Sequence, residues 1–233
     1  MSDDALKKLI DGFKSFRKEN YELHPDRMKE LVENGQHPKT LVIACCDSRS
    51  GPETVLGADP GEIFVGRQIA ALIPPHDDAD KDDAIAASIE YAVDVLQVEN
   101  IIVIGHSNCG GIDGLAKDFN DGAVGNWIQR GREIKDRVEK KHGKNLPHEE
   151  LAEKMERESV LWSLENLRDY PSVKKAMKEG RLQTHAWQFE MTHGELKAYN
   201  PKTQDFDVLA GGAPTNEKPP QHQPKRRNGG FHK

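Results

Sequence analysis

The side chains of this chain that can bind a metal follow directly after two apolar runs. The first run ends in "LVIACCDSR", with Cys45, Cys46 and Asp47, and the second ends in "IIVIGHSNCGG", with His106 and Cys109. One cysteine together with a His-x-x-Cys pair is a three-ligand set for Zn²⁺, and it leaves the fourth tetrahedral position open, as catalytic zinc sites do. The spacing therefore predicts a catalytic zinc site.

Strand geometry separates the two adjacent cysteines. Successive side chains of a strand point to opposite faces, so Cys45 and Asp47 share one side while Cys46 points away. We predict that Cys45 is the ligand that joins His106 and Cys109. We expect Cys46 to pack behind the strand. Spacing alone leaves two alternatives open: a cysteine that is merely a small apolar residue, and a redox pair.

The elements around these motifs alternate between strands and helices. The runs "KTLVIACC", "GEIFVGRQ" and "IIVIGH" are typical of strands, and "DDAIAASIEYAVDVLQVEN" has the apolar spacing of a helix before the third strand. This alternation predicts an α/β fold with a mostly parallel β-sheet flanked by helices. Ligands of such sheets bind beyond the carboxyl ends of the strands, so the two motifs are expected to meet in space.

Later segments complete the predicted fold. Residues 126–168 contain two helical segments, and "YPSVKKAMKEG" indicates a short helix that Gly180 ends. The stretch "RLQTHAWQFEMTHGELKAYN" predicts a hairpin of two strands around "THGE".

Changes in composition divide the chain into three parts. Residues 1–34 have a helical apolar stripe that His24-Pro25 interrupts, and we expect this N-terminal helical arm to pack on the core or on a partner subunit. Residues 35–210 form the predicted zinc domain. Residues 211–233 lack apolar periodicity and are rich in Pro, Gly and basic residues, which predicts a disordered basic tail.

The overall composition indicates which classes of partner and which cellular compartment to expect. The 233 residues carry a net charge of -6, which argues against a nucleic-acid partner. No stretch approaches the roughly 20 apolar residues of a membrane span, so no membrane partner is expected. The first residues are acidic where a signal peptide is basic, and three cysteines do not make a disulfide framework. We therefore expect a cytoplasmic protein.

Taken together, the motifs resemble those of the β-class carbonic anhydrases. The resemblance rests on "CCDSR", "PGEIFVGR", "SIEYAV", "GHSNCGG" and "THAWQFEMTHGEL", which occur in the family's order over roughly residues 25 to 200. It implies a lyase that catalyses the reversible hydration of carbon dioxide to bicarbonate and a proton. It also implies that Cys45, His106 and Cys109 bind Zn²⁺.

The resemblance further implies roles for polar residues beside the metal. Asp47 would orient the nucleophile, and Arg49 would keep Asp47 ionised through a charge-assisted hydrogen bond. Gln36 matches a glutamine that hydrogen-bonds the substrate. A surface salt bridge is the alternative for the Asp47–Arg49 pair.

Apolar pocket residues are implied by the same resemblance. Phe64, Ile69 and Tyr91 match positions that line a narrow apolar pocket at a dimer interface, whereas ordinary core packing is the alternative for each. A homodimer or a higher homo-oligomer is therefore expected, in which Gln36 and Tyr91 serve the zinc of the partner subunit.

Departures from the family pattern affect the expected subtype and substrate. The segment "RQIAA" has Gln68 and Ala71 where the family usually has asparagines, and Val42 stands where some members have a tryptophan that helps to bind bicarbonate. Val42 and Gln36 together imply a plant-like enzyme with an open site. The altered segment leaves carbonyl sulfide or carbon disulfide hydrolysis as an alternative on the same zinc scaffold. A zinc-containing binding or regulatory protein without turnover is a further alternative.

Overall fold

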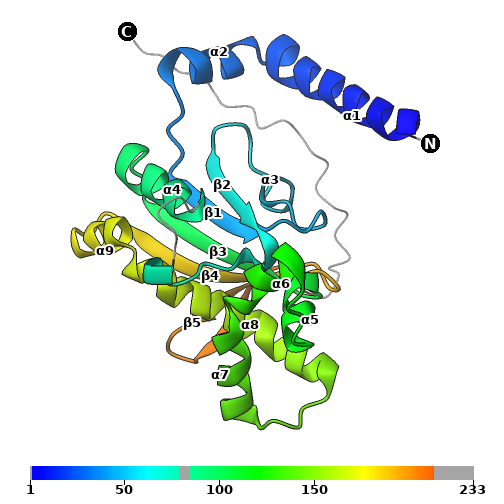
Figure 1. Cartoon of the computed structure of the whole chain (residues 1–233). Coiled ribbons are helices and arrows are strands. Elements are labelled where there is room, and N and C mark those ends of the chain that lie inside the picture. Colours follow the sequence, from blue (N-terminus) through cyan, green and yellow to red (C-terminus); the bar gives the residue numbers. More distant parts are fainter. Residues whose placement is uncertain (1, 79–83, 213–233) are drawn as a thin grey trace.

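The structure is a computed structural model that describes residues 2–78 and 84–212. Its centre is a six-stranded sheet with the order β2-β1-β3-β4-β5-β6 (Figure 1). The first four strands pair in parallel and the last two pairings are antiparallel. The strands are β1 (Thr40–Cys45), β2 (Ile63–Gln68), β3 (Asn100–His106), β4 (Gln183–Glu190), β5 (Glu195–Asn200) and β6 (Asp205–Ala210). The predicted mostly parallel α/β fold and the hairpin of β4 and β5 are confirmed.

The helices of the body connect the parallel strands. Between β1 and β3 lie α3 (Pro52–Val55), the short turns η2 (Ile69–Ala71) and η3 (His76–Asp78), α4 (Ala84–Glu90) and the π-helical turn η4 (Tyr91–Val95). Between β3 and β4 lie α5 (Gly110–Ala116), α6 (Gly122–Gln129), α7 (Arg132–His142), α8 (His148–Asp169) and α9 (Pro171–Lys178). One helical segment predicted within residues 126–168 is therefore two helices, because the chain turns at Gly131 between α6 and α7.

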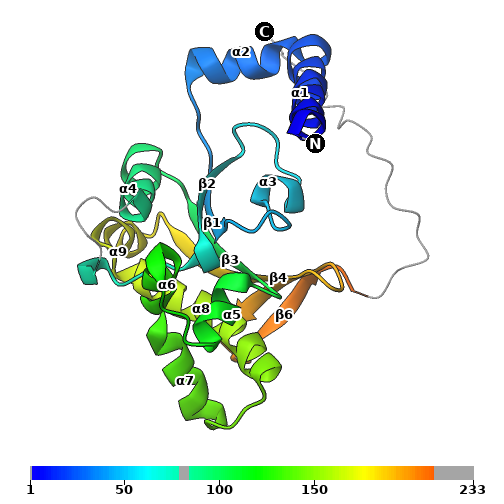
Figure 2. The ribbon, with the colours of Figure 1, turned by 45° about the vertical axis from the view of Figure 1, so that its right-hand side comes forward.

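Alternate residues of β1 belong to different apolar cores. Leu41 and Ile43 join the core formed with α4, η4, α8 and α9, whereas Val42 and Ala44 contact the apolar side chains of the opposite face. Cys45 joins a second core with the first turns of α5 and the middle of α8. Helices α6, α7 and α8 lie together on the side of the sheet away from the N-terminal arm (Figures 1 and 2). The alternation therefore directs Cys45 toward the helical layer, where α5 and α8 supply its neighbours.

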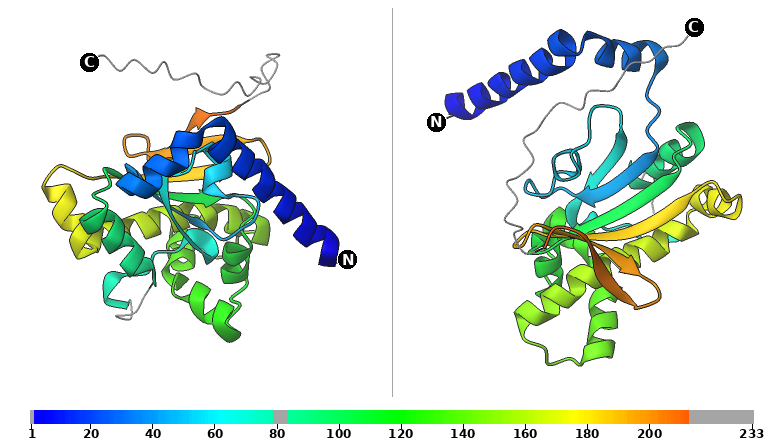
Figure 3. Two further views of the ribbon diagram at one scale, coloured as in Figure 1. Left: turned by 90° about the horizontal axis from the view of Figure 1, so that it is seen from above. Right: turned by 180° about the vertical axis from the view of Figure 1, so that it is seen from behind.

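The first helix of the N-terminal arm lies apart from the core, whereas its last helix contacts the turn before β2 through Leu31 beside Gly61 and Arg27 with Asp59. The arm consists of α1 (Ser2–Arg17), η1 (Lys18–Leu23) and α2 (Pro25–Asn34), with the predicted interruption at His24. Figure 3 shows α1 extending beyond the body of the molecule. The side chains of its apolar stripe are exposed: Leu6, Leu9, Ile10, Phe13 and Phe16. The apolar stripe of α1 therefore does not pack on the chain's own core, and its packing on a partner subunit stays a prediction.

Two expectations concern the remaining chain. Residues 213–233, which contain nearly all of the predicted disordered tail, lie outside the described residues. Within residues 2–78 and 84–212, no helix combines the length and the apolar composition that crossing a membrane requires.

Candidate metal centre

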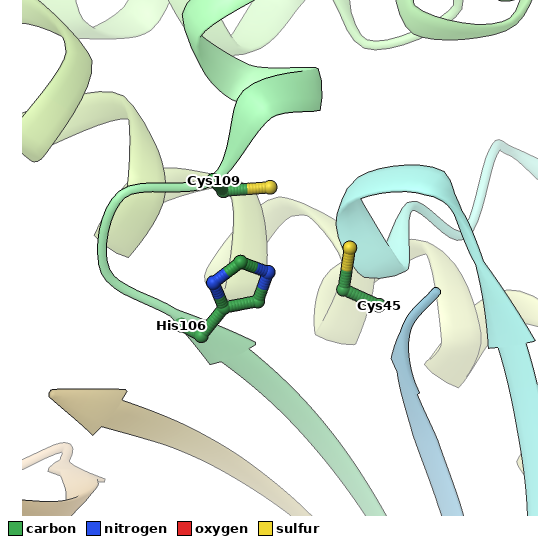
Figure 4. A group of neighbouring side chains, drawn as sticks. All are labelled: Cys45, His106 and Cys109. Atoms are coloured by element: carbon green, nitrogen blue, oxygen red, sulfur yellow. The ribbon is translucent and has the colours of Figure 1, made fainter. Parts of the chain in front are cut away.

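Three potential ligands converge at the carboxyl ends of two neighbouring strands. β1 ends at Cys45, β3 ends at His106, and Cys109 precedes the first residue of α5. One ligand atom from each residue lies within 4.8 Å of the other two, and all three residues are buried. Figure 4 shows the two sulfur atoms and the imidazole ring facing a common space. The structure thus brings together the three residues that the spacing predicts.

The imidazole of His106 is oriented as a metal ligand requires. Its Nδ1 lies 2.9 Å from the carbonyl oxygen of Ser107, which can only accept, so Nδ1 donates. In the neutral ring, Nε2 then carries the lone pair. Nε2 is buried and has no hydrogen-bond partner among the described residues. A buried nitrogen without a hydrogen-bond partner destabilises the fold unless it binds another group, and a metal ion fits this position.

The sulfur atoms of Cys45 and Cys109 lie close enough together to bind one cation. The side chain of Cys109 and, to a smaller extent, His106 lower the pKa of Cys45 to about 4, although burial opposes this change. Contact with Cys45 and burial raise the pKa of Cys109. The Asp47 amide also donates to Cys45 Sγ at 3.4 Å. Two cysteine sulfurs and one imidazole nitrogen are the donor types that zinc prefers, so the residues present fit this ion.

Asp47 and Arg49 form a bidentate pair beside the ligands. Arg49 Nε donates to Asp47 Oδ1 at 2.9 Å and Nη2 donates to Oδ2 at 2.7 Å. These hydrogen bonds hold the pKa of Asp47 well below its ordinary value, despite partial burial. The Arg49 backbone amide also donates to Oδ1, at 2.9 Å, and this is the third hydrogen bond between the two residues. Arg49 Nη2 also donates to the carbonyl of Asn108 at 3.1 Å, which ties the pair to the loop that carries Cys109.

The backbone between Cys45 and Asp47 is fixed by a second arginine. Arg67 of β2 donates from Nε to the Cys45 carbonyl at 2.9 Å and from Nη2 to the Asp47 carbonyl at 2.7 Å. Cys46 is exposed, so the prediction that it packs behind the strand is wrong. The physical reason is that β1 ends at Cys45, and strand alternation no longer applies to the loop that follows.

The expected pocket residues lie in two separate places. Ile69 follows β2 near the metal ligands and is partly exposed. Phe64 is the second residue of β2 and lies four residues before the Gln68 that pairs with Cys45, which is about 13 Å along the strand. The ring of Tyr91 lies 5.8 Å from the ring of Phe64. Within one chain, Phe64 and Tyr91 are therefore remote from the ligand cysteines.

Gln36 also lies away from the metal ligands. It is exposed in the loop before β1, at the end of that strand opposite to Cys45. The structure does not bring Gln36 together with the ligands of its own chain.

The segment that departs from the family pattern has an unusual backbone. Ala70 and Ala71 have φ values of 60° and 52°, in the left-handed region that alanine rarely adopts. Gln68 Nε2 donates to the Leu72 carbonyl at 3.1 Å, and Trp127 Nε1 donates to the Ile69 carbonyl at 2.9 Å. These side chains hold the turn, and the sequence reasoning did not identify the part of Trp127.

A buried carboxylate near the ligands was also missed. Glu156 of α8 accepts a hydrogen bond from the Cys109 amide at 2.9 Å. The available signal was its position among Met155, Ser159 and Val160, because an acidic residue on the apolar face of a helix needs a buried partner.

Comparisons with known proteins were made for sequence and for structure. Residues 40–196 match the sequence profile of the family described as "Carbonic anhydrase". The chain is 38% identical to beta carbonic anhydrase 3 of Arabidopsis thaliana over 82% of this chain and 75% of that protein. It is 33% identical to a carbonic anhydrase of Pseudomonas aeruginosa over 88% of this chain and 92% of that protein.

Two solved structures are similar over most of the chain. The β-carbonic anhydrase CcaA has a TM-score of 0.79 and 32% identity, and the match covers 88% of this chain and 99% of that one. One of two tetrameric β-carbonic anhydrases from Sordaria macrospora has a TM-score of 0.75 and 27% identity, with 84% of this chain and 96% of that one covered.

Proposed function

The chain belongs to the β-class carbonic anhydrase family, and from this we propose how its own residues carry out the reversible hydration of carbon dioxide to bicarbonate and a proton. The protein is a carbonic anhydrase. The observation that carries the proposed site is the convergence of two cysteine sulfurs on a buried His106 Nε2 that has no partner among the described residues. The catalytic domain is proposed to span residues 35–210.

Cys45, His106 and Cys109 would hold a Zn²⁺ ion. The ion would lower the pKa of a water molecule and so supply hydroxide near neutral pH, as catalytic zinc does in general. The donor set of two sulfurs and one imidazole supports the assignment of the metal.

Asp47 is proposed to orient the attacking hydroxide. Among the described residues, its Oδ2 accepts one hydrogen bond, from Arg49, and a carboxylate oxygen can accept a second one. Because Arg49 keeps Asp47 ionised, Oδ2 can accept the hydroxide proton as a hydrogen bond, which leaves an oxygen lone pair free for the carbon of carbon dioxide. Formation of the new C–O bond then gives bicarbonate.

The substrate pocket is proposed to form between two copies of the chain. Ile69 lies beside the ligands of its own chain, whereas Gln36, Phe64 and Tyr91 lie at the other end of the sheet. We propose that these three residues face the zinc of the partner subunit. Support comes from the partial exposure of the Tyr91 ring and from the exposed apolar stripe of α1, which a second copy would cover. A homodimer or a larger homo-oligomer is therefore the proposed assembly.

The finer subtype is proposed to be plant-like, with an open site. Both carboxylate oxygens of Asp47 accept hydrogen bonds from Arg49. This arrangement favours an open site, in which the Asp47 carboxylate does not occupy the fourth position of the metal. Val42 is fully buried among apolar side chains and offers no polar group to a second bicarbonate. A reducing compartment such as the cytoplasm is proposed, because none of the three cysteines forms a disulfide.

Stopped-flow measurement of carbon dioxide hydration tests the activity. Purified, zinc-loaded protein should hydrate carbon dioxide well above the buffer background. No rate above background would refute the proposal, and faster sulfide release from carbonyl sulfide would overturn the choice of substrate.

Two variants separate the proposed roles at the site. Asp47→Ala should keep its zinc and lose most of its turnover, because the carboxylate orients the nucleophile and binds no metal. Cys109→Ala should lose the zinc itself, as measured by metal analysis. Equal zinc loss in both variants would make Asp47 a metal ligand and contradict its assigned role.

A further inference from the structure

The loop that carries two of the ligands is held from two sides. Asn108, between His106 and Cys109, has a φ of 56°, in the left-handed region that asparagine adopts more readily than most other non-glycine residues. On one side, Arg49 donates to the Asn108 carbonyl at 3.1 Å. On the other side, the carboxylate of Glu156 accepts the Cys109 amide at 2.9 Å. Hydrogen bonds from two separate elements therefore hold this turn in place.

Glu156 is an unusual residue for its position. It is only 7% exposed, and no ion pair joins it to any Lys or Arg of the described residues. Burial raises its pKa to about 7, while the Cys109 and Asn108 amides act in the opposite direction. A buried carboxyl group costs free energy unless its oxygens find partners. The partner found here is the backbone amide of Cys109, in the ligand loop.

The packing of α8 on β3 lets Glu156 reach the loop. A Cβ atom at Gly105 would collide with Val160 of α8 and would lie 2.8 Å from Gln188 Oε1. Gly105 therefore allows a close approach that a larger residue would prevent. Val160 is one helical turn after Glu156, so the close packing of α8 at Gly105 also places the Glu156 carboxylate next to the Cys109 amide.

We propose that Glu156 is a positioning residue that holds Cys109 in the pose that metal binding requires, acting on the amide of the ligand while Arg49 acts on the opposite side of the loop. This rests on the proposed function only in its assignment of Cys109 as a metal ligand. Groups that hold a metal ligand in place commonly affect metal affinity by about 10–100-fold when they are removed. A residue that merely stabilises α8 would change the stability of the metal-free protein and leave its affinity for zinc unchanged.

The test uses the full chain and three variants. Glu156→Ala removes the acceptor oxygen, whereas Glu156→Gln keeps an oxygen of the same size and reach. Glu153→Gln is the matched control, because Glu153 lies one turn earlier on α8, is exposed and pairs with Arg157. Zinc affinity is measured by competition with a chromophoric chelator. The sulfur-to-metal absorption band of the Co²⁺-loaded protein reports the geometry of the cysteine ligands.

Glu156→Ala should bind zinc about 10–100-fold more weakly and shift the cobalt band. Glu156→Gln should recover most of the affinity, and Glu153→Gln should match the unmodified chain. The proposal is overturned if Glu156→Ala keeps the affinity and spectrum of the control, or if Glu156→Gln is as weak as Glu156→Ala. If these metal-binding results hold while the unmodified protein hydrates no carbon dioxide, the proposed function fails and the role of Glu156 stands.

Discussion

Gly111 separates the helix after the metal ligands from the segment that carries Ile69. A Cβ atom at position 111 would lie 2.8 Å from Ile69 Cγ2 and 3.0 Å from Ala70 Cβ. Carbon atoms in ordinary contact are about 3.5–4.0 Å apart, so Gly111→Ala requires a shift of roughly 0.5–1 Å. Ile69 can rotate, but Ala70 Cβ moves only with its backbone, which already has a φ of 60°. The added methyl group should therefore displace the whole η2 turn.

The neighbouring glycine supplies the matched control. A Cβ atom at Gly110 would meet nothing within 4 Å, so Gly110→Ala adds the same methyl group to the same helix without a collision. Overpacking of this kind costs about 1–3 kcal/mol. The free energy of unfolding of Gly111→Ala should be lower than that of Gly110→Ala by this amount. Each kcal/mol lowers Tm by about 2–4 °C in a chain of this size. Both variants gain the same helix propensity, so the difference reports the collision.

The assay combines thermal unfolding with carbon dioxide hydration and zinc analysis. Gly111→Ala should keep its zinc and lose kcat/KM, because Ile69 moves while the ligands stay in place. Ala70→Gly in the same chain should restore part of the stability, since it removes the second colliding carbon, with a coupling of more than about 0.5 kcal/mol. Equal stability and activity for Gly111→Ala and Gly110→Ala would refute the reasoning.

Three further predictions concern residues around the site and the core. Cys46→Ser should keep zinc content and activity while it abolishes thiol labelling of the zinc-loaded protein, because Cys46 is the exposed cysteine; zinc loss would contradict this. Trp127→Phe should lower kcat/KM severalfold at unchanged zinc content, because the Ile69 carbonyl loses its donor; an unchanged rate would count against this role of Trp127. Burial lowers the pKa of His185 in the folded chain, so as the pH falls the imidazole is protonated in the unfolded chain before it is protonated in the folded one. The contribution of the neutral imidazole to the free energy of unfolding is therefore present above about pH 6.5 and is lost as the pH falls below that value. His185→Gln should therefore lose less stability than the unmodified chain between pH 7 and pH 5 in denaturant unfolding, and an equal loss would exclude this linkage.

The parts of the fold that were predictable have strong local patterns. β1 and β3 are β-branched runs buried on both faces, and the parallel arrangement places their carboxyl ends together. The convergence of Cys45, His106 and Cys109 follows from that arrangement. The break at His24-Pro25 was predictable for a local reason, since a proline favours an extended residue before it.

The features that were missed depend on contacts between distant segments. β6 is an edge strand with exposed Val208 and Leu209, so it lacks the buried pattern by which the other strands were identified. The contact of Glu156 with Cys109 joins residues 47 positions apart. Strand alternation could place Cys45 and failed for Cys46, because the end of β1 is set by its neighbours in the sheet.

The separation of Phe64 and Tyr91 from Cys45 has a genetic consequence. In the proposed dimer, each pocket takes its metal ligands from one chain and its distal wall from the other. A chain without Cys109 can therefore donate an intact wall, and a chain without the Tyr91 ring can donate an intact metal centre. Two alleles that are each inactive alone would then complement one another in a mixed dimer, which contains one complete pocket.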